Sequence, residues 1–168
     1  GSLINGDFYA NFDPEHEGHG GWRDSQIAAN IYGGGENWLT LNPADIILLH
    51  IGTNALDPDP SDVENILDKV DQFEADSGTH VTVVLARIIN RIPYSSTTTD
   101  FNDNVEAMAQ LRIAAGDDIV IVDMEDGAGI DYQVQPDGDM SSDELHPYST
   151  GYTKMAAVWY AALTGILD

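Results

Sequence analysis

An acid and a histidine stand three residues apart near the C-terminal end of the sequence, in Asp143-Glu144-Leu145-His146-Pro147. On a tight turn, this spacing lets the carboxylate orient the imidazole ring and fix its tautomer. That arrangement is the base half of a nucleophile-His-Asp hydrolase. A lone Asp-x-x-His motif is a weak signal, because many surface turns carry it by chance. It gains weight here from the elements around it and from two further motifs upstream.

The elements that must position this pair alternate between apolar runs and amphipathic stretches. Continuous Val, Ile and Leu without polar alternation indicate buried parallel strands. These runs cover residues 45–51, 81–86 and 119–123. Helical periodicity follows each run. It covers residues 61–73, about 101–115 and about 150–163. The alternation predicts an α/β fold, a three-layer α/β/α sandwich around a parallel sheet, with its functional residues at the carboxyl ends of the strands.

Four local features sharpen this expectation. A capping box at Ser61-Asp62-Val63-Glu64 predicts a helix start. Leu111 is expected on the inward stripe of the second helix, which Gly116 should end. The tract 95–99 is expected to be a solvated loop. His50, inside an apolar strand, is expected to be a core histidine with its hydrogen bonds satisfied.

Composition limits the function classes. The chain of 168 residues fits one domain, 1–168, and carries 29 acidic against 6 basic residues, a formal charge of −23. Such a field repels polyanions, so binding to nucleic acid is excluded. No apolar run approaches the length of a membrane span, and no N-terminal signal segment is visible, which predicts a soluble chain without a membrane partner. The excess of Asp and the scarcity of Lys suit a halophilic or a cation-rich extracellular setting. The absence of cysteine rules out disulfides.

Three blocks in chain order carry a family resemblance. They are Gly18-His19-Gly20-Gly21-Trp22, Gly52-Thr53-Asn54 and Asp143-Glu144-Leu145-His146-Pro147. Together they resemble the SGNH (GDSL-type) hydrolases, and their flanking residues look most like carbohydrate esterase family three, which includes acetylxylan esterases. The resemblance covers nearly the whole chain and implies a flavodoxin-like sheet. It implies a serine esterase that hydrolyses short-chain acyl esters, such as acetyl esters of carbohydrates, without a cofactor.

The resemblance also implies a role for each block. His146 would be the general base and Asp143 its orienting acid. The Gly21 backbone N–H and the Asn54 side chain would donate to the oxyanion of a tetrahedral intermediate. Three further residues are predicted to contact the substrate, although packing or surface ion pairing is the alternative for each: Trp22, Arg23 and Arg91.

The family's first block, a Gly-Asp-Ser turn after the first strand, does not appear in the sequence. Ser2 and Ser25 are the alternatives for the nucleophile, and neither has the expected surroundings. The sequence therefore predicts an N-terminally incomplete domain, inactive if no serine is supplied. Since the family's first strand is interior, its loss would leave the strand at 45–51 as an exposed edge, which predicts a homodimer or a swapped assembly. Ala55 is a second departure, because the family usually has Asp there.

Other readings remain open. A non-catalytic carbohydrate-binding or scaffold remnant is the main alternative function, with a cleft lined by Trp22, Tyr94 and Tyr148. A calcium-dependent module built on the many aspartates is a third. His16 and His19, with neighbouring glutamates, do not have a diagnostic metal-ligand spacing, so no metal is predicted. The ester substrate and the salt-adapted surface favour an extracellular location.

Overall fold

The computed structural model describes residues 16–54 and 56–168. In this part of the chain, three parallel strands form one sheet in the order β1-β2-β3. The strands are β1 (Ile46–Leu49), β2 (Thr82–Arg87) and β3 (Ile119–Asp123). The helices are α1 (Asp24–Ile31), α2 (Trp38–Leu41), α3 (Ser61–Ser77), α4 (Ser96–Ala115) and α5 (Ser149–Leu167). The predicted α/β fold with a parallel sheet is confirmed.

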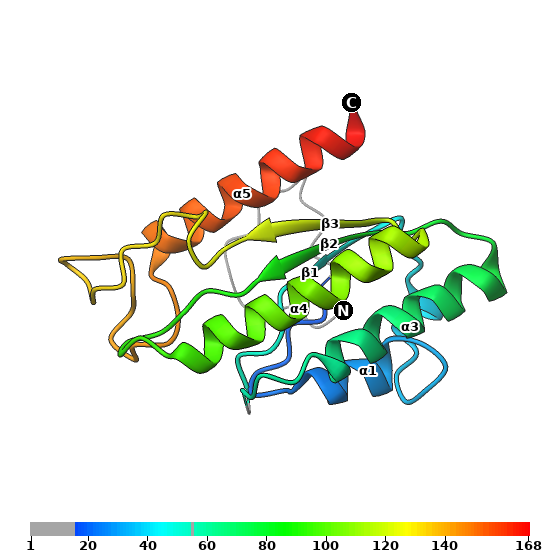
Figure 1. Ribbon diagram of the computed structural model, residues 1–168, viewed down its shortest axis with the longest axis horizontal. Coiled ribbons are helices and arrows are strands. Elements are labelled where there is room, and N and C mark those ends of the chain that lie inside the picture. Colours follow the sequence, from blue (N-terminus) through cyan, green and yellow to red (C-terminus); the bar gives the residue numbers. More distant parts are fainter. Residues whose placement is uncertain (1–15, 55) are drawn as a thin grey trace.

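Two helical layers enclose the sheet. α1, α3 and α4 lie on one face, and α5 crosses the other (Figure 1). The central strand β2 shows why: Val83 and Leu85 point into the cluster formed with α1, α3 and α4, whereas Val84 and Ala86 point into the cluster formed with α5. A strand that is buried on both faces favours apolar residues on both, which explains the unbroken apolar run at 83–86.

The helix α3 begins where the sequence predicts, but its start is capped differently. α3 buries the predicted stripe of Val63, Ile66, Leu67, Val70 and Phe73. Its capping box is wrong, however, because Ser61 already lies inside the helix. The Ser61 N–H instead donates to the Asp59 carboxylate at 2.9 Å, so an upstream acid satisfies the helix start.

α4 corrects two further expectations. The tract 95–99 is not a solvated loop, because Ser95 is the N-cap and its side chain accepts from the Thr98 N–H. Leu111 is 75% exposed. The buried stripe passes through Phe101, Val105 and Ala109, and a residue two positions beyond Ala109 points to the opposite side of a helix. Gly116 ends the helix as predicted, with its N–H donating to the Arg112 carbonyl.

β1 forms one edge of the sheet in the described part of the chain, since it pairs with β2 alone. Leu49 is buried against the α1, α3 and α4 layer, but Leu48 on the opposite face is 45% exposed. α5 projects beyond the sheet toward the C-terminus (Figure 1). It also leaves large apolar side chains in solvent, among them Tyr160 and Leu167.

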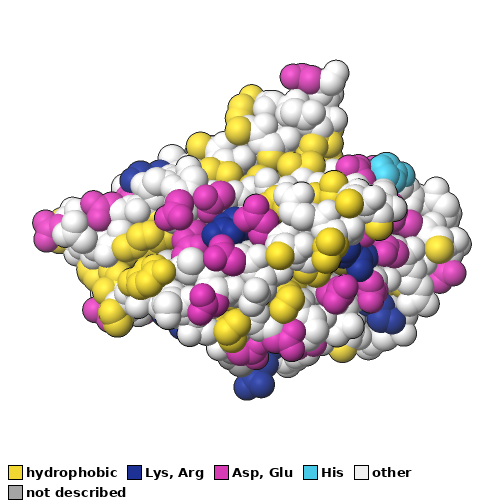
Figure 2. Space-filling view, in the orientation of Figure 1, with side chains coloured by type: hydrophobic (Ala, Val, Ile, Leu, Met, Phe, Trp, Pro, Cys, Tyr) yellow, Lys and Arg dark blue, Asp and Glu magenta, His cyan; other side chains and the backbone are white. Residues whose placement is uncertain are grey.

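The charge is spread rather than concentrated. Asp and Glu side chains are distributed across the visible face, and the few Lys and Arg side chains lie among them (Figure 2). Arg112 illustrates this, because it forms ion pairs with Asp68, Asp71 and Asp117 at 2.5–2.6 Å and so ties α3 to the end of α4. No helix in the described ranges combines the length and the apolar character that crossing a bilayer requires.

Candidate active site

Asp143 and His146 lie on the tight turn that their spacing predicts. The Asp143 Oδ2 atom is 2.6 Å from His146 Nδ1. The other carboxylate oxygen, Oδ1, accepts from the Leu145 N–H, the His146 N–H and the Ser141 hydroxyl at 2.7–3.0 Å. The carboxylate is therefore fixed by its own turn, and the ring is oriented by the carboxylate. Glu144 makes the turn possible by adopting a positive φ of 63°.

This environment favours the ionised acid. Hydrogen bonds from the His146 backbone, the Ser141 hydroxyl and the Leu145 backbone hold the pKa of Asp143 well below its usual range. An ionised carboxylate accepts hydrogen bonds only, so His146 Nδ1 must carry the proton in this contact. In the neutral ring, Nε2 is then left as a proton acceptor. Both side chains are more than half exposed, at 63% for His146 and 52% for Asp143.

The loop that precedes this turn is held by an ion pair. Asp139 is buried and accepts from Lys154 on α5 at 2.5 Å and from the Asp131 N–H at 2.8 Å. These contacts lower the pKa of Asp139 to about 2, with the Lys154 contact as the largest cause. The Asp139 carbonyl in turn accepts from the Tyr148 N–H at 2.7 Å, at the N-cap of α5. The loop that precedes the turn of the base is thus attached to α5 at two points.

The glycine block and the asparagine block are in direct contact. The Asn54 Nδ2 atom donates to the Trp22 carbonyl at 2.8 Å. Gly21 forms the preceding turn with a φ of 79°, a conformation that strongly favours glycine. In the described residues no protein group accepts the Gly21 N–H, and one N–H of the Asn54 amide remains beyond the contact with Trp22. One backbone donor, the Gly21 N–H, and one side-chain donor, the Asn54 amide, are therefore brought together after the end of β1.

Gly52 permits the close packing under this block. Its φ is 122°, and a Cβ atom at this position would lie 2.4 Å from the Phe101 ring. The loop after β1 therefore packs directly against the Phe101 ring of α4, and this contact helps to position Asn54 relative to the sheet. Arg91, from the loop after β2, donates to the Thr53 carbonyl at 3.3 Å. Arg91 thus supports the asparagine loop, which agrees with the structural alternative given for this residue.

The other predicted contact residues lie near the glycine block. The ring of Trp22 stacks on His19 at 4.1 Å between centroids, and Trp38 stacks on the same His19 at 5.1 Å. Arg23 is exposed at the start of α1, and its backbone N–H donates to Gln26. Ser25 is exposed on α1. Ser2 and Ala55 lie outside the described residues.

His50 corrects the sequence expectation. Its Nε2 atom is buried and has no hydrogen-bond partner within residues 16–54 and 56–168, so this ring nitrogen is not satisfied there. Burial lowers the pKa of His50 to about 4, and the ring is therefore neutral near pH 7. The sequence showed that His50 interrupts an apolar run, but the partner of a buried nitrogen is decided by tertiary contacts.

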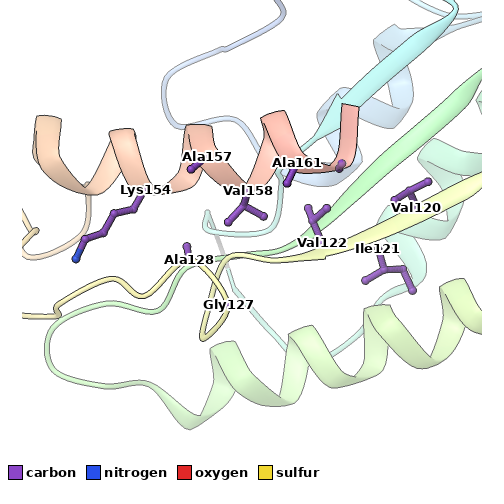
Figure 3. Close-up of a pocket in the computed structure, with 10 residues that line it drawn as sticks. Val120, Ile121, Val122, Gly127, Ala128, Lys154, Ala157, Val158 and Ala161 are labelled. Carbon is purple, nitrogen blue, oxygen red and sulfur yellow. The ribbon is translucent and has the colours of Figure 1, made fainter. Parts of the chain in front are cut away.

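A cavity in the described region lies away from these motifs. It has a volume of about 550 Å³ and opens between β3 and α5, where Val122 and Ala128 face Val158 and Ala161 (Figure 3). None of its lining residues is a predicted site residue. The candidate chemistry is therefore carried by an open surface at the strand ends rather than by this apolar groove. Within residues 16–54 and 56–168, no group of three or more His, Asp or Glu side chains is arranged to hold a metal ion.

Known proteins are similar to this chain in sequence and in fold. No family model matches the chain. A protein described as "Putative endoglucanase X" from Acetivibrio thermocellus is 27% identical over 146 residues, and the chain spans about 58% of that protein's length. A structure of an acetyl esterase mutant with acetate ion superposes with a TM-score of 0.79 and 26% identity, covering 94% of this chain and 74% of the other.

Two further structures are of family 3 carbohydrate esterases. The one from Clostridium thermocellum has a TM-score of 0.71 and 29% identity, covering 89% of this chain and 68% of the other. The one from Talaromyces cellulolyticus has a TM-score of 0.77 and 27% identity, covering 92% of this chain and 72% of the other. The chain therefore has the SGNH-type hydrolase fold and is related, over most of its length, to carbohydrate esterases of family 3.

Proposed function

We propose that this chain provides the base and the oxyanion donors of an SGNH-type esterase that hydrolyses short-chain acyl esters, with acetylated carbohydrate as the substrate class. The observation that carries the proposal is the 2.6 Å contact between Asp143 Oδ2 and His146 Nδ1. It presents Nε2 as a proton acceptor at the strand ends, where a general base is required. The relation to carbohydrate esterases supports the choice of substrate.

In the proposed reaction, His146 Nε2 accepts the proton of a nucleophilic hydroxyl as its oxygen bonds to the acyl carbon. The Gly21 N–H and the Asn54 amide donate to the resulting oxyanion. His146 then returns the proton to the departing alcohol oxygen as the ester bond breaks, and water releases the acyl group by the same two steps. Trp22, Arg23 and Arg91 border these donors and are proposed to contact the alcohol part of the substrate.

The nucleophile is not assigned. Ser141 lies in the same turn as the base, but its hydroxyl donates to Asp143 at 2.7 Å and so supports the orienting acid. In the described residues, no serine hydroxyl contacts His146 Nε2. Without a serine, the loss in kcat would reach about a million-fold, leaving weak hydrolysis from the remaining groups.

Fluorophosphonate labelling with peptide mapping tests the proposal. The probe is applied to the purified chain and, as a control, to His146→Ala. A single label that requires His146 identifies the nucleophile and supports a working serine esterase. A folded chain that takes no label, or a label that persists in His146→Ala, contradicts an esterase that works without an added segment.

The aromatic cluster favours one alternative. His19, Trp22 and Trp38 form a stacked surface beside the proposed oxyanion donors. Aromatic faces of this kind suit a non-catalytic carbohydrate-binding role. Binding of an acetylated xylo-oligosaccharide that is lost in Trp22→Ala and unchanged in His146→Ala would support the alternative over the esterase.

The edge of the sheet supports a proposal about assembly. β1 has an unpaired edge in the described structure, and Leu48 is 45% exposed beside it. An exposed apolar edge strand is a template for pairing with another chain. A homodimer or a swapped assembly through β1 would cover this edge and bring an additional segment close to Asn54.

A further inference from the structure

The loop between β2 and α4, residues 88–95, connects the two halves of the candidate site. On one side, the Arg91 guanidinium donates to the Thr53 carbonyl at 3.3 Å, one residue before Asn54. On the other side, the Ile92 N–H donates to the Glu144 carbonyl at 2.9 Å, inside the turn of Asp143 and His146. A shift of this loop would change the placement of Asn54 relative to His146.

Asn90 fixes the shape of the loop. Its side-chain oxygen accepts from the Arg91 N–H at 2.9 Å and from the Ser95 N–H at 2.8 Å. Its side-chain nitrogen donates to the Ser95 carbonyl at 3.0 Å. Asn90 is only 2% exposed. One amide side chain thus joins the beginning and the end of the segment that carries Arg91 and Ile92.

Glu125 anchors Asn90 from the segment that follows the neighbouring strand β3. It follows β3 and is 4% exposed. One carboxylate oxygen accepts from Asn90 Nδ2 at 2.8 Å and from the Thr99 hydroxyl at 2.5 Å. The other accepts from Asn102 Nδ2 at 2.9 Å and lies 3.4 Å from the Arg87 guanidinium. The loop, the start of α4 and the end of β3 therefore converge on one buried side chain.

This arrangement has little freedom to relax. A buried acceptor that loses its donors destabilises the folded chain, and the cost is larger if the acceptor is charged. All four partners of Glu125 donate, so an acceptor-only group matches them and an amide does not. None of these side chains reaches the proposed reaction centre, yet they determine where its two halves stand.

We infer that Glu125 and Asn90 are positioning residues: through loop 88–95 they set the placement of the Asn54 donor relative to the His146 base. Their importance for catalysis rests on the proposed function, whereas the coupling itself is a property of the structure. The effect of Glu125 on Asn54 and His146 is therefore measurable without any substrate.

The experiment compares Glu125→Gln with Arg112→Gln by NMR on the ¹⁵N-labelled full chain. Arg112 is the matched control, because it also contacts several charged side chains from different elements. Its ion pairs join α3 to the C-terminal end of α4 and do not involve loop 88–95. In Glu125→Gln, the Asn54 side-chain amide and the His146 ring nitrogens should shift. Exchange of the Ile92 N–H should accelerate by about tenfold or more, because a mismatched buried donor costs more than about 1.4 kcal/mol. In Arg112→Gln, these site signals should not move.

Two outcomes overturn the inference. Unchanged Asn54 and His146 signals in a folded Glu125→Gln would show that loop 88–95 does not transmit the change. Equal shifts in Arg112→Gln would show that the site responds to any loss of stability. If Glu125→Gln does not fold, Thr99→Val removes one donor to Glu125 and is judged by the same criteria. Absence of a fluorophosphonate label with these shifts intact would contradict only an esterase that works without an added segment, and would leave the positioning role of Glu125 and Asn90 standing.

Discussion

At the scale of single residues, the two oxygens of Asp143 have separate tasks. Oδ1 holds the turn through three donors, and Oδ2 holds the His146 ring. Their combined effect keeps the pKa of Asp143 well below its usual range, with the His146 backbone N–H as the largest cause. Acidification to about pH 5 should therefore leave the carboxylate ionised and the ring orientation intact.

Asp143→Asn tests this division of tasks. An amide in this position can still accept from the backbone, so the turn should persist, but it can also donate to the ring. The protonated nitrogen of His146 should then no longer be restricted to Nδ1. Imidazole ¹⁵N chemical shifts should show a mixture of tautomers in the variant and a single tautomer in the parent chain. A single tautomer in both would contradict the assigned role of Asp143.

His50 leads to a prediction about acid stability. Burial lowers the folded-state pKa of His50 to about 4, whereas the unfolded-state value is the ordinary 6.5. Below about pH 6.5 the unfolded chain therefore binds more protons, and the free energy of unfolding should fall as the pH decreases toward 4. The contribution of His50 is at most about 3 kcal/mol. It should be absent above pH 7.

Urea unfolding across pH 4.5–7.5 measures this effect. His50→Leu should flatten the decrease in unfolding free energy with falling pH, since leucine takes up no proton. His80→Gln is the control, because His80 is exposed and forms ion pairs with Glu74 and Asp118. If the unfolding free energy of His50→Leu falls with decreasing pH as steeply as that of the parent chain, another group is responsible for this decrease.

At the scale of elements, the loop after β1 depends on its contact with α4. Gly52→Ala introduces a Cβ atom 2.4 Å from the Phe101 ring in a backbone conformation that disfavours side chains. Overpacking and backbone strain together should reduce the unfolding free energy by about 2–4 kcal/mol. Gly20→Ala is the matched control, because nothing lies within 4 Å of a Cβ atom there. Chemical denaturation that shows the same loss for both variants would contradict this account.

The sequence predicted those elements whose signal is local. The apolar runs of β1, β2 and β3 and the stripe of α3 are visible because strand and helix periodicity are written in neighbouring residues. The start of α4 was missed because Ser95 reads as a loop residue until its hydroxyl is seen to accept from the Thr98 N–H. Leu111 was assigned to the buried stripe because it is apolar. Apolar character alone does not show on which side of the helix a residue lies, and Leu111 lies on the exposed side.

The same distinction between local and long-range contacts decides which residues of the candidate site could be predicted. Asp143 and His146 were found because their contact spans three residues. The Asn54 contact with Trp22 spans 32 residues, and that of Asn90 with Glu125 spans 35. Such pairs have no sequence signature, since Asn, Glu and Thr are ordinary surface residues until the fold buries them together. The family resemblance supplied Asn54, and only the structure supplied Glu125.

At the scale of the molecule, the β1 edge and the net charge of −23 act against each other. Repulsion between two such chains is screened by salt, whereas apolar strand pairing is not. Light scattering should therefore detect a growing dimer fraction as NaCl increases from 0.05 M to 1 M. Leu48→Asp should abolish this dimer. Leu111→Asp changes the same residue type at a more exposed position on α4 and should leave the dimer intact, and equal effects would exclude β1 as the interface.

The two faces of the sheet also differ in how much they bury. The cluster beneath α1, α3 and α4 contains many more buried side chains than the cluster beneath α5. α5 should therefore detach from the sheet in a partial opening that leaves the larger layer folded. Since Lys154 and Tyr148 attach the His146 turn to α5, the base would leave with the helix while Asn54 stayed in place. Hydrogen exchange should accordingly show α5 amides exchanging together, ahead of those of β2, so that half of the proposed catalytic machinery belongs to a separate cooperative unit.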